Sequence, residues 1–176
     1  HADTLITLSE LAKLTALSME EVQKDVEELR EQKLVDTFAM RKDTYVWHAD
    51  SKRAAVHTLK NALRTFEEKY PYRYGMKKAE VQMTYFKKVK PNVFDKIVEL
   101  LEEEGEIKRT EEFLGTPEFE ICKDAVYERV SRKILATLKN AKYDFVRYSE
   151  IEFQGKDGAV SDDILNILLE EKEVVK

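Results

Sequence analysis

Residues 9–35 read SELAKLTALSMEEVQKDVEELREQKLV and contain two short helical patterns separated by a turn. Ser9 is expected to cap the first helix, and Ser18, with a glutamate three residues later, has the signature of a capping box for the second. Apolar residues recur at helical spacing along the second pattern. Two β-prone runs follow, residues 34–38 and 45–47, with a polar turn between them. Helix, turn, helix and hairpin is the order of a winged-helix module.

The same pattern occurs three times along the chain. A triplet of a small residue, glutamate and an apolar residue recurs at intervals of 70 residues: Ser9-Glu10-Leu11, Ala79-Glu80-Val81 and Ser149-Glu150-Ile151. In each case a leucine that closes a second helical pattern follows the apolar residue after 18, 20 and 18 residues: Leu29, Leu101 and Leu169. Two features that recur together at nearly constant spacing indicate a structural repeat. The fold class that we predict is mainly α with small β-hairpin wings, an elongated array of tandem winged-helix modules.

We place the three modules at residues 3–50, 51–121 and 122–176. In the second, helices are expected at 51–69, 77–83 and from Pro91 to about Glu104, followed by a wing at 107–121 that turns near Gly115-Thr116-Pro117. In the third, helices are expected at 123–140, 148–153 and 161–171, and Val174-Val175-Lys176 is expected to begin a wing strand. The first module lacks an opening helix and the third stops within its wing, so we expect a fragment of a longer protein.

The composition is that of a folded protein with much charged surface. Of 176 residues, 43% are hydrophobic and 37% charged, with a net charge of −5, so any nucleic-acid contact depends on a local basic patch. The single cysteine, Cys122, cannot form an internal disulfide, which favours a reducing compartment and a cytoplasmic protein. The longest apolar runs, such as residues 164–169, are far too short to span a membrane. We expect no membrane contact and a monomer.

The sequence offers no catalytic constellation, so we expect a protein that is not an enzyme. The glycines, at positions 75, 105, 115, 155 and 158, fit neither a P-loop nor a dinucleotide fingerprint. The histidines, His1, His48 and His57, are scattered, and such residues are more often surface or packing residues than ligands. We therefore expect no metal and no cofactor.

The third helix of each module is acidic. Residues 20–31, 95–104 and 162–172 each contain more Asp and Glu than Lys and Arg. A winged helix that reads DNA places this helix in the major groove, where acidic side chains repel phosphates. A DNA-binding transcriptional regulator is therefore a weaker hypothesis than RNA or protein binding.

One stretch is both basic and rich in aromatic residues, and it supplies our main RNA-binding candidates. These are Lys69, Tyr72, Arg73, Tyr74, Lys77, Lys78, Lys87, Lys88 and Lys90. Cations beside aromatic rings suit RNA, because the cations contact phosphates and the rings stack on bases. The structural alternative is that the rings pack between modules and the lysines only solvate their rim.

A second, weaker basic set lies in the third module. It comprises Arg132, Lys139, Lys142 and Arg147, with Arg129 and Lys133 nearby. Ordinary helix-surface charge is the competing interpretation of this set.

Residues 66–81, FEEKYPYRYGMKKAEV, resemble the second winged helix of bacterial selenocysteine-specific elongation factors (SelB). Residues 94–107 are similar to the close of that domain, which ends in a Gly-x-Ile sequence. The resemblance implies an array of winged helices that follows a GTPase and reaches a selenocysteine-insertion hairpin in the mRNA, with the last module as the main RNA grip. Its expected partners are RNA and the ribosome. A DNA-binding regulator and a winged-helix scaffold for protein partners remain the alternatives.

Overall fold

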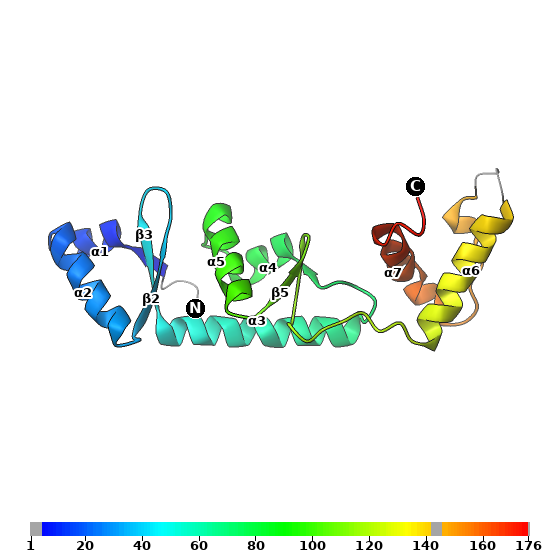
Figure 1. The fold of residues 1–176 in the computed structure, drawn as a ribbon, viewed down its shortest axis with the longest axis horizontal. Helices are drawn as coiled ribbons and strands as arrows, with labels where there is room; N and C mark the ends of the chain where they lie inside the picture. Colours follow the sequence, from blue (N-terminus) through cyan, green and yellow to red (C-terminus); the bar gives the residue numbers. More distant parts are fainter. Residues whose placement is uncertain (1–4, 142–145, 176) are drawn as a thin grey trace. The chain divides into compact units, whose positions relative to one another are not determined.

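The computed structural model describes residues 5–141 and 146–175, and its contacts divide the chain into two compact units (Figure 1). The first unit comprises His1–Thr65 and Met76–Pro117, and the second comprises Phe66–Gly75 and Glu118–Lys176. Helices dominate, and both sheets found among the described residues have three antiparallel strands. The predicted fold class, helical with small β wings in winged-helix modules, is confirmed.

The first module has the elements that the repeat predicts, together with one strand that it does not. The order is β1 (Leu5–Thr7), α1 (Leu8–Thr15), α2 (Met19–Glu31), β2 (Val35–Ala39) and β3 (Thr44–His48). The strands form one sheet in the order β1-β3-β2. In the central strand, Val46 lies opposite Ile6 of β1 on one side and opposite Thr37 of β2 on the other. The sequence does not predict β1, because three residues are too few to show an alternating pattern.

Two side chains cap the helices of this module. Ser18 and Glu21 form the predicted capping box of α2. The predicted cap of α1 is wrong: Thr7, rather than Ser9, forms a capping box with Glu10. The box needs a glutamate three residues after the cap, and Glu10 satisfies that spacing for Thr7 only.

The second module is α3 (Ala49–Lys69), β4 (Met76–Lys77), α4 (Lys78–Tyr85), α5 (Pro91–Glu103), β5 (Lys108–Thr110) and β6 (Phe113–Gly115). Its core contains Leu59 and Leu63 of α3, which are fully buried. It also contains the rings of Phe86 and Phe94, whose centroids are 5.0 Å apart. The strands form a second sheet in the order β4-β6-β5. The predicted wing turn near Gly115 is wrong, because the chain turns at residues 111–112, where Glu111 has a positive φ of 52°.

The third helix of every module ends in the same way. The residue after each helix cap has a positive φ: Lys33 (58°), Gly105 (71°) and Lys172 (59°). Its amide donates to a carbonyl three residues back, and the next amide donates to a carbonyl five residues back, as in a Schellman motif. Of these three positions only the second has glycine, the residue that adopts this conformation without cost.

The second unit contains α6 (Ala125–Ala141), a 3-10 turn η2 (Tyr148–Glu150) and α7 (Asp157–Glu170). Two predictions need correction here: the expected helix at 148–153 is a single turn, and the last helix begins at residue 157 instead of 161. The expected strand at 174–176 is also wrong for residues 174 and 175, and residue 176 lies outside the described part. A strand needs a hydrogen-bonded partner, and the described residues of this unit provide none.

Candidate nucleic-acid interface

The turn between α4 and α5 displays three of the predicted RNA-binding lysines, Lys87, Lys88 and Lys90, all of them exposed. The turn itself is firmly held. The side chains of Phe86 and Val89 are buried beneath it, and the Gln82 Nε2 donates to the Val89 carbonyl at 3.0 Å. The lysines therefore project from a fixed scaffold, so less entropy is lost when they bind a ligand.

The start of α5 adds partial positive charge to this turn. Lys90 occupies the N-cap without a side-chain cap, Pro91 follows it, and the first turn of the helix contains no acidic residue. Unsatisfied amides at a helix N-terminus favour phosphate. The acidic residues that made this helix unsuitable for DNA lie further along it. The total charge of the helix does not show that its acidic residues are absent from the first turn. The sequence signal for that first turn is Pro91 directly after Lys90.

Lys77 and Lys78 lie where β4 passes into α4. Lys77 is exposed, whereas the Lys78 Nζ is 2.7 Å from the Asp95 Oδ1. Both partners of that ion pair remain substantially exposed, so the pair contributes little to stability. Lys78 is thus partly neutralised, and Lys77 is the more available cation of the two.

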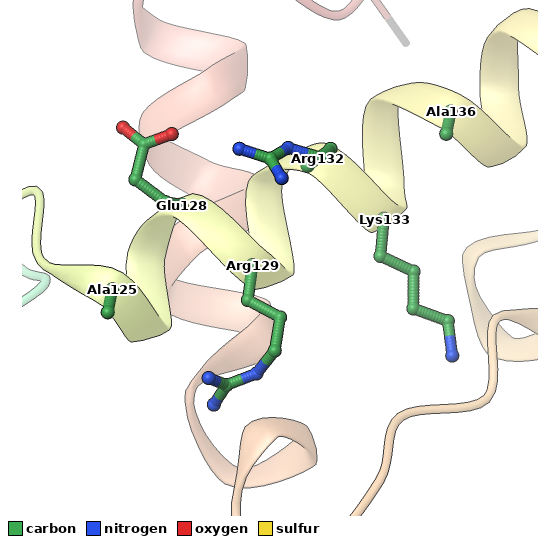
Figure 2. Close-up of a pocket in the computed structure, with 6 residues that line it drawn as sticks. All are labelled: Ala125, Glu128, Arg129, Arg132, Lys133 and Ala136. Atoms are coloured by element: carbon green, nitrogen blue, oxygen red, sulfur yellow. The ribbon is translucent and has the colours of Figure 1, made fainter.

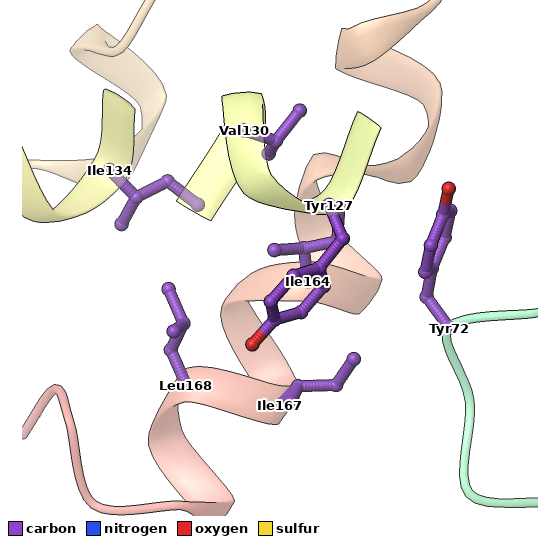
Figure 3. Close-up of a cluster of buried hydrophobic side chains, with 7 residues drawn as sticks. All are labelled: Tyr72, Tyr127, Val130, Ile134, Ile164, Ile167 and Leu168. Atoms are coloured by element: carbon purple, nitrogen blue, oxygen red, sulfur yellow. The ribbon is translucent and has the colours of Figure 1, made fainter. Parts of the chain in front are cut away.

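The aromatic part of the predicted stretch belongs to a different unit from these lysines. Tyr72 is 6% exposed and lies in the core formed by α6 and α7, beside Tyr127 and Ile164 (Figure 3). Its hydroxyl donates to the Asp124 carboxylate at 2.9 and 3.0 Å. Burial, reinforced by this acidic partner, raises the pKa of Tyr72 to about 12. In this position the ring packs against protein and is not displayed to a base.

The neighbours of Tyr72 have partners in the same unit. Arg73 lies over the Tyr70 ring, 4.1 Å from its centroid, and its Nε is 2.8 Å from the Asp163 Oδ1. The Lys69 Nζ is 5.2 Å from the same ring. Tyr74 is half-buried against the core of the unit. In these contacts the loop residues act as packing groups within the second unit.

Asp124 links this loop to the start of α6. Its Oδ1 accepts the amides of Val126 and Tyr127 at 3.0 and 2.9 Å, besides the Tyr72 hydroxyl. The amide of Tyr127, more than the Tyr72 hydroxyl, holds the pKa of Asp124 below its ordinary value. Asp124 is not among the residues predicted from the sequence, although an aspartate just before a helical pattern is a recognised cap signal.

One face of α6 has a shallow depression of about 630 Å³ that is lined by Arg132 of the weaker basic set and by the nearby Arg129 and Lys133 (Figure 2). Arg129 forms a two-pronged pair with Asp157, with both distances 2.6 Å, and Lys133 donates to the Glu152 carbonyl. Arg132 and Lys139 point from the same helix and are exposed. Arg147 is exposed beside η2, and Lys142 lies outside the described residues.

The described ranges show neither of two further kinds of site. Within them, no three His, Cys, Asp or Glu side chains are grouped so as to hold a metal ion. Each helix in the same ranges is too short or too polar to cross a bilayer.

The order of helices and the small three-stranded sheets define this chain as one built from winged-helix modules. Residues 61–115 match the family described as "Elongation factor SelB, winged helix". The matched segment runs from within α3 to the end of β6, so the second module is similar to a SelB winged-helix domain, and the resemblance seen in the sequence is confirmed there. No curated protein matches the chain.

Proposed function

We propose that this chain is a non-catalytic winged-helix part of a selenocysteine-specific elongation factor and that its second module contacts RNA. In this role it links a GTPase part to the mRNA hairpin, on the ribosome, in the cytoplasm, as a monomer. The observation that carries the proposal is a basic turn on the module that matches SelB: Lys87, Lys88 and Lys90 at the N-terminus of α5.

The charges support contact with the RNA backbone over sequence-specific reading of a duplex. Cations and amides gather at the N-terminal end of α5, whereas Glu99, Glu102 and Glu103 lie toward its other end. A recognition helix lying in a major groove brings much of its length close to phosphates, which these acids oppose. A turn that touches the backbone at one end avoids that repulsion.

Fluorescence anisotropy with labelled RNA tests this proposal. The probes are a selenocysteine-insertion hairpin, a scrambled hairpin and a DNA duplex of equal length. We expect both RNAs to bind better than the duplex. Lys87→Gln with Lys88→Gln should weaken RNA binding roughly ten-fold at low salt, because two charge-assisted contacts are lost. The salt dependence should fall by about 0.7 per lost contact on a single strand.

Lys13→Gln with Lys24→Gln is the matched control, since it removes two exposed lysines from the helices of the first module. RNA binding by this control should stay within about two-fold of the parent protein, because exposed charges at a distance are screened. Clear preference for duplex DNA, or equal losses in the two double variants, would contradict an RNA contact at the turn.

Exposed apolar side chains favour a second candidate function, docking of a protein partner on the first module. Leu14 is 76% exposed, and Leu17 and Met19, which follow it around the α1–α2 turn, are also exposed. Leu14→Gln with Leu17→Gln should then reduce co-sedimentation with ribosomes while leaving RNA anisotropy unchanged. Unchanged co-sedimentation would remove this candidate.

A further inference from the structure

A groove of about 730 Å³ lies in the first unit along one side of α3, at a distance from the basic turn. Glu104 and Glu106, which follow α5, and Asp36 of β2 complete its walls. The basic turn lies at the other end of α5, and a helix of 13 residues is about 20 Å long. The groove is therefore a separate surface, and its properties do not depend on the proposed function of the turn.

Cations outnumber carboxylates along the groove. Its six basic side chains are Lys33, Lys52, Arg53, His57, Lys60 and Arg64. Its three carboxylates are already engaged by lysines. The Lys52 Nζ lies 2.9 Å from Asp36 and 2.6 Å from Glu104, and Lys60 lies 2.9 Å from Glu106. An excess of positive charge thus remains in a chain whose net charge is −5.

Four polar side chains form a row along α3. Arg53, His57, Asn61 and Arg64 follow one another at helical spacing along α3. Arg53 also pairs with Asp50, but both side chains are more than two-thirds exposed, so water competes strongly with that pair. The row is about 16 Å long at 1.5 Å per residue, so it can contact more than one phosphate of a strand.

Lys33 adds a cation to the groove from a different element. It lines the groove from the end of α2, where it adopts a positive φ of 58°. At the matching position the second module has Gly105. A side chain in this conformation costs roughly 1 kcal/mol or more, and Lys172 bears the same cost at the equivalent position of the third module. A lysine here places a cation opposite the α3 row.

We propose that this groove binds the sugar-phosphate backbone of a single RNA strand, with Lys33, Arg53, His57 and Arg64 contacting phosphates. Arginine and lysine donate to phosphate oxygens, and the Asn61 amide and a ring N–H of His57 can donate to phosphate or ribose oxygens. The groove is open along its length, which suits a strand that passes through it more than an enclosed small ligand.

The Lys33→Gly variant separates binding from folding. Glycine relieves the strain at this position, so the variant should be as stable as the parent or more stable, and any loss of binding cannot come from unfolding. Lys172→Gly is the matched control. It makes the same substitution at the equivalent position of the third module and removes the same charge, outside the groove.

The test is anisotropy of the whole chain with labelled oligouridylate of about twelve nucleotides at several salt concentrations. Lys33→Gly combined with Arg64→Gln should bind roughly ten-fold more weakly at low salt, with the salt slope reduced by about 1.4. Lys172→Gly should stay within about two-fold of the parent. Both results should also hold when Lys87 and Lys88 are glutamine, which separates this groove from the turn.

Three outcomes would overturn the proposal. The first is an unchanged affinity and salt slope in the groove variant. The second is an equal loss in Lys172→Gly. The third is full displacement of the oligonucleotide by inorganic phosphate at a matched phosphate concentration, which would mark a site for a small anion instead of a strand.

Discussion

Tyr72 and Arg73 are adjacent in the sequence and both belong to the predicted RNA-binding set, yet both have protein partners. The Tyr72 hydroxyl donates to Asp124, and the Arg73 guanidinium lies between the Tyr70 ring and Asp163. A basic aromatic stretch has the same composition whether its rings pack or are displayed. At the residue scale, the tertiary partners determine whether a ring is buried or displayed, and none of these partners could be identified from the stretch itself.

Tyr72→Phe should lower the stability of the second unit by about 1–2 kcal/mol at pH 8, because a buried hydroxyl bond to a carboxylate is lost. The pKa of Tyr72, raised to about 12, also predicts a pH dependence. The unfolded tyrosine ionises near pH 10 and the folded one near 12, so stability is lost between these values. Urea unfolding followed by circular dichroism should show a loss of about 2–3 kcal/mol across this range.

Other groups titrate over the same range, so the comparison with Tyr72→Phe isolates this contribution. The loss attributable to Tyr72 should be missing in that variant. Tyr70→Phe, which keeps the ring beneath Arg73, is the control and should retain it. The interpretation fails if Tyr72→Phe and the parent protein lose equal stability on going from pH 10 to 12.

At the element scale, some helix ends can be predicted from the sequence and others cannot. The sequence predicts Gly105 as a helix stop, and this residue does follow the cap of α5 with a positive φ. The equivalent helix ends at Lys33 and Lys172 lack glycine, so the residue type there does not indicate a helix stop. Only the sequence repeat shows that these two positions correspond to Gly105. The strands β1 and β4, with three and two residues, carry too few side chains to show a period.

Opposite substitutions at these helix ends should change stability in opposite directions. Gly105→Ala should cost about 1 kcal/mol, and the cost comes from the backbone alone, since no atom lies within 4 Å of an added Cβ. Lys33→Gly should be neutral or stabilising by up to about 1 kcal/mol. Guanidinium unfolding of both variants measures these changes. A destabilised Lys33→Gly would show that the lysine side chain makes stabilising contacts that outweigh its strain.

The start of α6 depends on Asp124. Asp124→Ala should destabilise the second unit by about 1–3 kcal/mol, because the helix loses its cap and the Tyr72 hydroxyl loses its partner. The pKa of Asp124 is lowered in the fold, so its stabilising contribution is present above about pH 4 and is lost as the pH falls through the lowered value.

Unfolding free energies at pH 7 and pH 3 test this capping role. Asp124→Ala should differ strongly from the parent protein at pH 7 and less at pH 3. In a double-mutant cycle, Asp124→Ala should cost less in the Tyr72→Phe background, because one shared bond has already been removed. Additive costs would mean that the two side chains do not stabilise each other.

For the whole molecule, the repeat is the strongest predictor. Recurring triplets and anchor leucines are enough to identify winged-helix modules from the sequence, and the match of residues 61–115 to SelB agrees with them. The candidate site is harder to predict. Lys69 and Lys90 fall in one basic stretch of sequence but in different structural units. Residues that are close in the sequence need not belong to the same structural unit, because the loop between them packs in a different core.

The net charge of −5 and the acidic third helices predict that only a few phosphates contact the molecule at once. The three lysines of the turn, Lys87, Lys88 and Lys90, together with Lys77 at the start of α4, should give a slope of about −3 for the logarithm of RNA affinity against the logarithm of salt concentration. Contacts in the α3 groove should steepen it to about −5 or −6. Anisotropy titrations at several salt concentrations measure this slope. A slope near −3 that Lys33→Gly leaves unchanged would confine RNA to the turn, whereas a slope of about −10 would require a basic surface much larger than either of these.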